Sequence, residues 1–310
     1  MTKGSDQEGM YPTAVTQKVY KLGNPYLHTF LVKGQDCALI EAGISSSARQ
    51  VIEQLQQMEI PPENIRYLLV GHAHFDHATG IPTLKKAFPH LQVLARPYAA
   101  QLLAKPKVFA SFMQEEVPMV QRLAQKGYRA QHLIDPAHSP CAQQSIAVDR
   151  VMEDGDLLEL GGDCTLRLIA TPGHSPCSMA VYLEQEQVLF PSDCTGYPVK
   201  PGYVWPVYFY SYEEYVTSLK KLQQLDVQVV AGPHEMIVYG GENCTLHLKQ
   251  AELEAIKLRE AIIQDFKQGV SREEISARLF ASHYINGLTN LSEDNIKGCM
   301  DLLVRRSLET

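Results

Sequence analysis

Four side chains that can bind metal ions lie within one short stretch of the chain. The stretch "VGHAHFDHATG", residues 70–80, contains His72, His74 and His77, with Asp76 beside the last of them. In an extended segment, residues two apart point the same way, so His72 and His74 can bind one ion. Asp76 and His77 then face a second position. A helix beginning there would place its positive N-terminal end near the Asp76 carboxylate.

Three more metal-binding side chains follow apolar runs later in the chain. His174 lies in "TPGHS", Asp193 in "FPSDCTG" and His234 in "AGPHE", each directly after a predicted strand. A sheet delivers such side chains to one rim. Five neutral imidazoles supply the nitrogen that zinc or iron prefers, and two carboxylates with a hydroxide offset most of the charge of two divalent ions. Calcium and magnesium sites would want oxygen ligands instead.

The elements that position these residues are predicted from hydrophobic periodicity. Apolar runs at 29–34, 37–43, 67–72 and 91–97 indicate strands, and residues 45–58 have the spacing of a helix. Residues 98–128 favour helices and lead into a proline-containing connector that ends at residue 140. A second strand-rich half begins near residue 146. Its strands are predicted at 164–170, 179–185, 187–193 and 227–234, and its helix at about 212–225.

Purely helical periodicity begins near residue 242. We expect the first helix of this region to bury a stripe formed by Leu253, Ile256, Ile263 and Phe266. Ser271, with Glu274 three residues later, marks the start of a second helix, and Ser292 can cap the last one. The last helix has one face formed by Ile296, Met300 and Leu303. The predicted organisation is a flexible tail (1–13), a main domain (14–241) and a C-terminal helical appendage (242–310).

Composition restricts the class of protein. The chain has 310 residues, of which 45% are hydrophobic and 20% charged, enough for a large packed core. A net charge of -7 argues against a nucleic-acid partner, because phosphate binding needs clustered Lys and Arg. No apolar run is long enough to cross a bilayer, so we expect no membrane partner. Seven cysteines without a CxxC pair, and an opening segment without an apolar signal sequence, indicate a cytoplasmic protein with reduced thiols.

In order and type, these residues resemble the metallo-β-lactamase superfamily, whose hydrolases carry HxHxDH followed by a His, an Asp and a last His. The resemblance implies an α+β fold, an αββα sandwich of two mixed sheets. It implies two divalent metal ions as cofactors, with zinc favoured and iron or manganese as alternatives. The first ion would be held by His72, His74 and His174, and the second by Asp76, His77 and His234, with Asp193 bridging.

Several residues near the expected ligands depart from the usual pattern of the superfamily. Ser192 precedes Asp193 where a Gly is usual, and Cys177 stands where relatives commonly have Gly. Glu41 in "LIEAG" occupies the place of an aspartate that contacts a ligand in many members, so we expect it to orient a ligand histidine. The alternative is an ordinary solvated Glu at a strand end. Cys194 should turn away from Asp193 and pack in the core.

The remaining histidines have no partners at ligand spacing. We interpret them as structural, and His283 is the one exception left open because it lies in the appendage. They are His28, His90, His132, His138, His247 and His283.

The chemistry that two such ions supply is hydrolysis. A hydroxide that bridges the metals is nucleophilic at neutral pH, and Asp76 is the candidate catalytic residue that orients it or takes its proton. The motifs "LIEAGIS", "GHAHFDH" and "GDLLELGG", with a three-helix tail, are similar to a thioesterase-like subgroup of the superfamily. In that subgroup the tail covers the active-site mouth. The appendage is therefore expected on the active-site side, with "SHYINGLTN" near the entrance.

The segment that follows Asp193 is a candidate wall for the pocket that would hold the acyl group of a substrate. It contains Lys200 and a cluster of aromatic side chains, namely Tyr197, Tyr203, Trp205, Tyr208, Phe209 and Tyr210. The functional interpretation is a pocket wall for an apolar or aromatic acyl group, with Lys200 near an anionic portion. The alternative is a loop that packs its aromatic rings on the sandwich. The expected partner is a small-molecule acyl thioester or ester, and a homodimer is left open.

Other functions of the fold remain as alternatives. A lactonase or other ester hydrolase would use the same ligands, and a regulatory or binding protein could retain the metal site and act through its surface. Nuclease activity is disfavoured by the acidic charge, and lactam hydrolysis by the helical tail and Asp193. Diiron oxidoreductases of this fold usually carry Glu at the position of His74 and act with a flavin domain, so we do not expect their chemistry.

Overall fold

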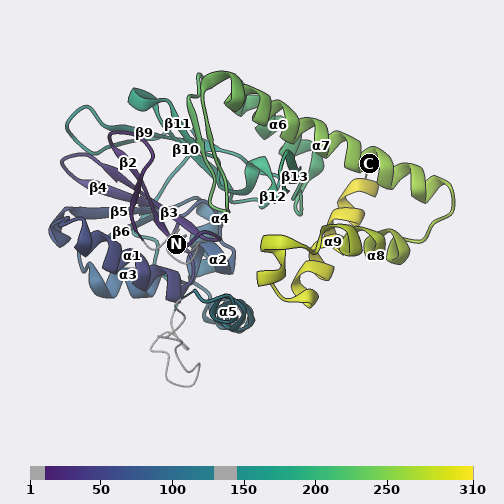
Figure 1. The fold of residues 1–310 in the computed structure, drawn as a ribbon, viewed down its shortest axis with the longest axis horizontal. Coiled ribbons are helices and arrows are strands. Elements are labelled where there is room, and N and C mark those ends of the chain that lie inside the picture. The colour runs from purple at the N-terminus through teal and green to yellow at the C-terminus, as the bar shows by residue number, and fades with distance from the viewer. Residues whose placement is uncertain (1–10, 129–144, 310) are drawn as a thin grey trace, which may run out of the picture.

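Two β-sheets face each other in the computed structural model, which describes residues 11–128 and 145–309 (Figure 1). Helices lie against the outer face of each sheet, and a helical region forms the C-terminal end of the chain. The predicted αββα sandwich of the α+β class, with its C-terminal helices, is therefore confirmed. Some of the predicted features lie outside the described residues. They are most of the tail 1–13, the connector through residue 140, His132 and His138.

The first sheet contains seven strands in chain order. Its first four strands are antiparallel and the later ones are parallel. Parallel neighbours need a crossover connection, which α1 (Ser45–Gln57) and α3 (Ile81–Ala87) provide. The strands are β1 (Thr13–Ala14), β2 (Val19–Gly23), β3 (His28–Lys33), β4 (Cys37–Ile40), β5 (Ile65–Leu69), β6 (Gln92–Ala95) and β7 (Arg150–Val151).

The second sheet has the strand order β15-β14-β11-β10-β9-β8. All its neighbours are antiparallel except β11 and β14, which are joined through α6 (Tyr212–Leu222). Its strands are β8 (Leu157–Glu159), β9 (Thr165–Ala170), β10 (Met179–Leu183), β11 (Val188–Phe190), β14 (Val229–Ala231) and β15 (Ile237–Tyr239). A separate hairpin, β12 (Tyr197–Lys200) with β13 (Tyr203–Trp205), leaves the sandwich after β11.

Alternation of side chains along the strands accounts for the layers. In β10, Met179, Val181 and Leu183 belong to the apolar core between the two sheets, whereas Ala180 and Tyr182 belong to the outer core. Because residues two apart share a face, the first set packs against the facing sheet and the second against α6 and α7 (Gly241–Lys267). Burial of both faces explains why the strand is apolar throughout.

The remaining helices cover the first sheet or form the C-terminal region. The helical stretch predicted at 98–128 contains α4 (Pro97–Leu103) and α5 (Pro106–Gln125). The short α2 (Phe75–Ala78) begins directly after His74 and holds Asp76 in its first turn, as the sequence indicated. The C-terminal region consists of α7, α8 (Arg272–His283), η5 (Asn286–Asn290) and α9 (Glu293–Leu308).

The buried face of α7 is not the predicted stripe. Leu253 and Phe266 are each 44% exposed. The residues that α7 buries are Cys244, Leu248, Ala251, Ala255 and Ile262. Several of these are small, and small side chains let a helix approach its neighbours closely, so selecting the most hydrophobic residues chose the wrong side. The helix starts were predicted correctly, since Ser271 and Ser292 accept backbone N–H groups at the N-termini of α8 and α9.

The C-terminal region is attached to the rest of the molecule on two sides of η5. Asn286 donates to the backbone oxygen of Val199 on β12 at 2.6 Å, and Lys126, directly after α5, donates to Asn290 Oδ1 at 2.6 Å. α8 and α9 pack on one another, and α9 packs on α7 (Figure 1). These hydrogen bonds therefore hold the C-terminal region between α5 and the β12–β13 hairpin.

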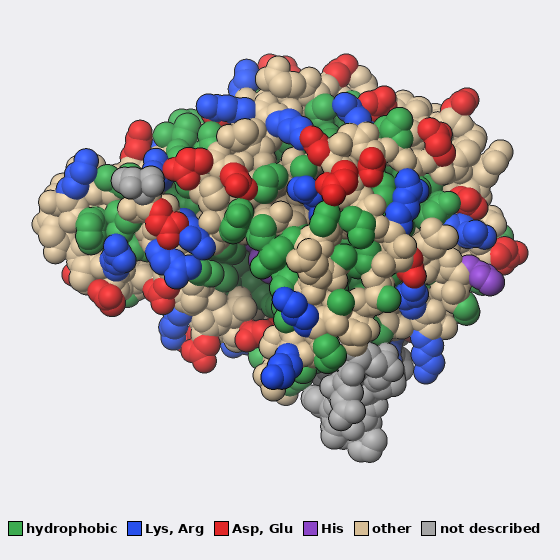
Figure 2. Space-filling view, turned by 180° about the vertical axis from the view of Figure 1, so that it is seen from behind, with side chains coloured by type: hydrophobic (Ala, Val, Ile, Leu, Met, Phe, Trp, Pro, Cys, Tyr) green, Lys and Arg blue, Asp and Glu red, His purple; other side chains and the backbone are tan. Residues whose placement is uncertain are grey.

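The surface carries charges of both signs. On the face drawn in Figure 2, Lys and Arg side chains are interspersed with Asp and Glu. Within the part of the chain that the structure describes, no helix combines the length and apolar character needed to cross a bilayer.

Candidate metal centre

All seven predicted ligands follow strands whose ends meet at one edge of the sandwich. His72 and His74 follow β5 in the first sheet, and α2 then carries Asp76 and His77. The second sheet contributes the other three, which follow β9, β11 and β14 and are His174, Asp193 and His234. The fold thus brings together residues that lie as far apart in the sequence as 72 and 234.

Three imidazoles form the first group. His72 Nε2 lies 2.9 Å from His74 Nδ1, and His174 Nε2 lies 3.1 Å and 3.0 Å from those two atoms. Nitrogens that share one zinc ion at about 2.0–2.1 Å each lie within about 3.5 Å of one another, so this triangle has the size of a metal-binding set. His72 and His174 are buried, and His74 is partly exposed.

The second group contains His77, His234 and Asp76. The two Nε2 atoms are 3.3 Å apart, and Asp76 Oδ2 lies 3.7 Å from each of them. Asp193 lies between the groups: its Oδ2 is 3.4 Å from His174 Nε2 and 3.5 Å from His77 Nε2. The Asp193 carboxylate can therefore reach ions in both groups, as a bridging ligand must.

The opposite ring nitrogens show that the histidines present lone pairs to the centre. His174 Nδ1 and His234 Nδ1 lie 2.8 Å and 3.1 Å from the backbone oxygens of Val207 and Tyr26, which can only accept. In its neutral form an imidazole has one N–H, so the neutral form of either ring leaves Nε2 free to bind a metal. Several unprotonated nitrogens and two carboxylates that converge in a buried space fit divalent cations.

Glu41 is not a solvated residue at a strand end. It is 3% exposed, and its Oε2 lies 3.1 Å from His77 Nδ1, on the side of the ring that faces away from Asp193. The structure thus places Glu41 where the sequence led us to expect it, behind a predicted ligand. Glu41, His72 and His77 also form a third group of potential ligands. However, His77 Nδ1 faces Glu41, and His72 Nδ1 faces Ser192. The Nε2 atoms of both rings face other histidines of the two metal groups.

The electrostatics divide the histidines into two kinds. Burial and the neighbouring histidines lower the pKa of His72 well below its usual value, and burial, followed by His174, lowers that of His74 to about 3. These rings are neutral at pH 7, the form that binds metal. Burial lowers the pKa of His77 too, but Glu41, Asp193 and Asp76 outweigh it and raise the pKa well above the usual value. The second group therefore attracts positive charge strongly.

A cavity of about 630 Å³ opens over the two groups. Its floor includes His74, Asp76, His174, Asp193 and His234. Its walls come from α5, the β12–β13 hairpin and the C-terminal region, and are largely apolar: Phe112, Trp205, Val207, Phe209, Leu288, Leu291, Ile296 and Leu302. Among the described residues that line it, none is Lys or Arg, and Glu115 and Asp294 are acidic. The volume and lining suit a small apolar ligand group.

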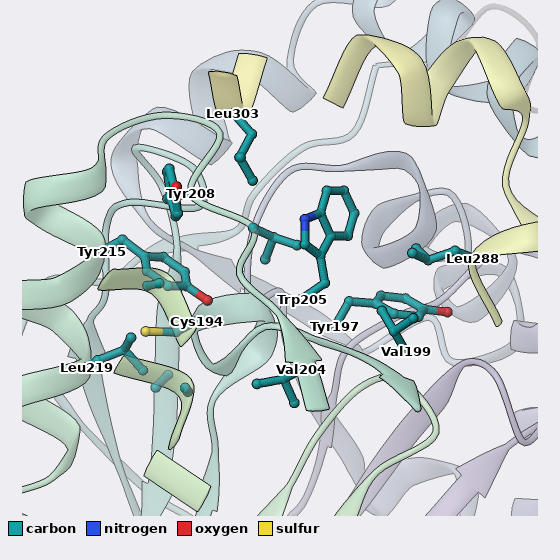
Figure 3. Close-up of a cluster of buried hydrophobic side chains, with 14 of the residues drawn as sticks. Cys194, Tyr197, Val199, Val204, Trp205, Tyr208, Tyr215, Leu219, Leu288 and Leu303 are labelled. Carbon is teal, nitrogen blue, oxygen red and sulfur yellow. The ribbon is translucent and has the colours of Figure 1, made fainter. Parts of the chain in front are cut away.

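The aromatic segment after Asp193 divides between cavity wall and core. Tyr197, Trp205 and Phe209 line the metal cavity. In Figure 3, Tyr197 lies toward Leu288 of η5, with Trp205 beside it. Tyr208 is buried and hydrogen-bonded to Ser307 of α9, and Tyr210 is 39% exposed. The segment thus contributes both to the wall of the metal cavity and to the core.

Lys200 lies outside the metal cavity. With Tyr203 and Lys126 it lines a neighbouring cavity of about 1050 Å³. Of the segment "SHYINGLTN", Leu288 lines the metal cavity, whereas Asn286, Gly287 and Thr289 line the neighbouring one. η5 therefore lies between the two spaces.

The other described histidines and Cys194 do not join the centre. His283 Nε2 is 2.8 Å from Tyr203 Oη and links α8 to β13, and His28 Nδ1 lies 2.9 Å from the backbone oxygen of Gly232. Cys194 is fully buried near Tyr215 and Leu219 (Figure 3), and burial raises the pKa of its thiol to about 12. Such a thiol stays protonated, so it is a poor metal ligand.

Comparison with known families agrees with this geometry. The family model described as the Metallo-beta-lactamase superfamily matches residues 26–234, more than half of the chain. The chain belongs to the metallo-β-lactamase superfamily. The match to this hydrolytic superfamily spans all seven predicted ligands, as well as Glu41 and Ser192.

Relatives within the metallo-β-lactamase superfamily include proteins named as thioesterases. The chain is 27% identical over 218 residues to the acyl-coenzyme A thioesterase MBLAC2 of Gallus gallus, covering 68% of this chain and 71% of the relative. It is 25% identical over 243 residues to an atrochrysone carboxyl ACP thioesterase of Aspergillus fumigatus, covering 78% of this chain and 59% of the relative. A relative named as a diflavin flavoprotein from Thermosynechococcus vestitus is 24% identical, and the chain spans only 33% of its length.

Solved structures show the same fold. A metallo-β-lactamase of Cronobacter sakazakii with a HARLDQ motif superposes with a TM-score of 0.59 at 20% identity, covering 83% of this chain and 98% of the other. The native FEZ-1 metallo-β-lactamase of Legionella gormanii gives a TM-score of 0.58 at 18% identity, covering 79% and 94%. The superfamily architecture therefore extends over most of this chain.

Proposed function

We propose that this chain is a dinuclear metal-dependent hydrolase that cleaves thioesters with apolar or aromatic acyl groups. The observation that carries the proposal is the pair of histidine groups, joined by Asp193, on the floor of a cavity with largely apolar walls. Relatives named as thioesterases support this choice within the superfamily. Zinc is the favoured metal, because most of the donors are imidazole nitrogens.

The residues of the chain would share the work of hydrolysis. When bound, two divalent ions would lower the pKa of a water molecule and polarise the substrate carbonyl. Asp76 is the proposed catalytic residue, because it lies on the cavity floor and its carboxylate can take the proton of the attacking water. A thiolate leaves without needing a proton, since a thiol has a pKa of about 8.5. Thioesters should therefore be cleaved faster than amides, whose amine leaving group must first be protonated.

The charges around the site indicate how a substrate would be oriented. The metal cavity has acidic and apolar lining, which favours a neutral acyl group and disfavours an acyl group with its own carboxylate. Lys126 and Lys200 line the neighbouring cavity, and each is held near a tyrosine ring, at 4.9 Å and 5.4 Å from the centroid. We place any anionic portion of the thiol carrier near these two lysines.

Steady-state kinetics on a thioester, a lactone and an amide with the same acyl group would test the proposed reaction. The zinc-loaded protein should show its highest kcat/KM with the thioester. A higher kcat/KM with the lactone would instead support a lactonase of the same fold. No turnover of any of the three by protein that holds two ions per chain would support a binding or regulatory role.

A further inference from the structure

We infer that Ser192 is a positioning residue that connects Glu41 to His72, so that one buried carboxylate orients a ligand in each metal group. The inference rests on the proposed function only in assuming that the centre binds metal. It concerns the residue directly before Asp193, the predicted bridging ligand.

The hydrogen-bond directions define the connection. Ser192 Oγ donates to Glu41 Oε1 at 2.7 Å, because an ionised carboxylate can only accept. The same Oγ lies 3.1 Å from His72 Nδ1. Because the Ser192 O–H already donates to Glu41, Oγ accepts the N–H of His72 Nδ1. Nε2 of His72 is then the unprotonated nitrogen, and it faces His74 and His174 in the first group.

The second oxygen of Glu41 serves the other group. Its Oε2 lies 3.1 Å from His77 Nδ1 and accepts the backbone N–H of Gly71 at 3.2 Å. Glu41 therefore contacts His77 directly, at ion-pair distance, and reaches His72 through the hydrogen bonds of Ser192. Outer partners of this kind fix the tautomer and the orientation of a metal-binding imidazole.

Backbone conformation at both ends of the connection argues against an incidental contact. Glu41 has φ of 68° and Ser192 has φ of 50°, in the left-handed region where glycine is the favoured residue. Both side chains are nearly fully buried, at 3% and 4% exposure. The chain thus accepts an unfavourable conformation twice in order to place these two side chains.

The space next to the Glu41 and Ser192 side chains is kept open by Gly71. A Cβ on Gly71 would lie 2.2 Å from both Glu41 Oε1 and Ser192 Oγ, so any side chain there would displace the connection. Glu41 and Ser192, which lie far apart in the sequence, can therefore meet here only because position 71 has no side chain.

Ser192→Gly separates this role from ordinary packing, because it relieves the backbone while removing the hydroxyl. The apoprotein, prepared with a chelator, is titrated with Zn²⁺ against a competing fluorescent chelator, and its Tm is measured separately. We expect the dissociation constant of one zinc ion to rise about tenfold or more, in the range known for outer partners of ligands, while that of the second changes less than about twofold. The apoprotein Tm should stay the same or rise, whereas a merely structural serine would lower it.

Two further variants and a control complete the test. Ser192→Ala, which keeps a side chain, should weaken the same ion, and Glu41→Gln should weaken both. Asp163→Gly is the matched control, since Asp163 has φ of 53° on the exposed loop before β9. It should leave both zinc dissociation constants unchanged.

Unchanged zinc affinities in Ser192→Gly and Ser192→Ala would overturn the inference, as would equal weakening of both ions in these variants. A parent protein that binds no zinc would instead remove the proposed dinuclear function on which the inference rests.

Discussion

At the scale of single residues, Asp193 is the predicted ligand on which the proposed dinuclear centre depends most. Its oxygens lie 3.4–3.8 Å from histidines of both groups. Asp193→Ala should therefore reduce the metal content from about two ions per chain to one or fewer. Thioester hydrolysis should fall by more than about 100-fold, since losing even an outer partner costs about 10–100-fold. Elemental analysis of protein purified without chelator measures the first effect.

The control for this prediction is Asp163→Ala, at an exposed position away from the centre. It should retain both ions and full activity. Two ions retained by Asp193→Ala would show that the carboxylate is not a bridging ligand.

Spacing in the sequence indicated which residues to bring together, but not what holds them in place. Alternation, strand ends and the resemblance to the superfamily select the seven predicted ligands, and the structure brings all of them close together. The outer partners of His174 and His234 are backbone oxygens of Val207 and Tyr26, which leave no mark in the sequence because every residue has such an oxygen. Ser192 did leave a signal, the departure from glycine, but its meaning required the positions of Glu41 and His72.

At the scale of elements, α5 and α9 determine the width of the metal cavity. Phe112 of α5 is partly buried in its wall. Phe112→Ala should lower kcat/KM for an octanoyl thioester by about tenfold, since a buried Phe contributes roughly 1.5–3 kcal/mol and 1.4 kcal/mol is tenfold in rate. Activity on the acetyl thioester should change less than about twofold. Steady-state kinetics with both substrates would show the difference.

Phe266→Ala is the matched control, because Phe266 is 44% exposed on α7 and lines neither of the two cavities. Equal losses on both substrates in Phe112→Ala would mean that Phe112 supports the fold and does not select the acyl group.

Ser292 caps α9, the helix that supplies much of the cavity mouth. Its hydroxyl accepts the backbone N–H of Asn295 at 3.1 Å. Ser292→Ala should lower the free energy of unfolding by about 1 kcal/mol, whereas Ser292→Gly should cost only a few tenths, because glycine is tolerated at an N-cap. Urea denaturation of the metal-loaded proteins measures both values, and equal costs would argue against the capping role.

Helices and strands were predictable where hydrophobic periodicity was strong. The predictions failed where packing against neighbouring elements determined which face is buried. The helix predicted at 45–58 is α1 almost to the residue, but the apolar stripe of α7 was placed on the wrong face. No strands are predicted from the sequence at the β12–β13 hairpin, although a Pro-Gly pair lies between its strands and is a turn signal. Its strands are short and project from the sandwich, so they carry no long alternating pattern.

At the scale of the whole molecule, metal should stabilise the fold as well as supply chemistry. The predicted ligands come from both sheets, so an ion held between them would tie the two halves together. Free Zn²⁺ at about 100 times the dissociation constant adds roughly 2.7 kcal/mol per site to the free energy of unfolding. Removal of the metal with a chelator should therefore lower Tm by about 5 °C or more. Differential scanning calorimetry checks this.

Added Zn²⁺ should restore the Tm, and Mg²⁺ at the same concentration should not, because the donor set is mainly nitrogen. A Tm that does not respond to chelator or zinc would indicate that the histidine groups are not occupied in the native protein.

Anomalous X-ray diffraction at the zinc edge, from crystals of the protein loaded with zinc, would locate the metal ions. We expect two peaks in each chain, one among His72, His74 and His174 and one among Asp76, His77 and His234, with Asp193 between them. A single peak among Glu41, His72 and His77, or no peak near these residues, would contradict this expectation.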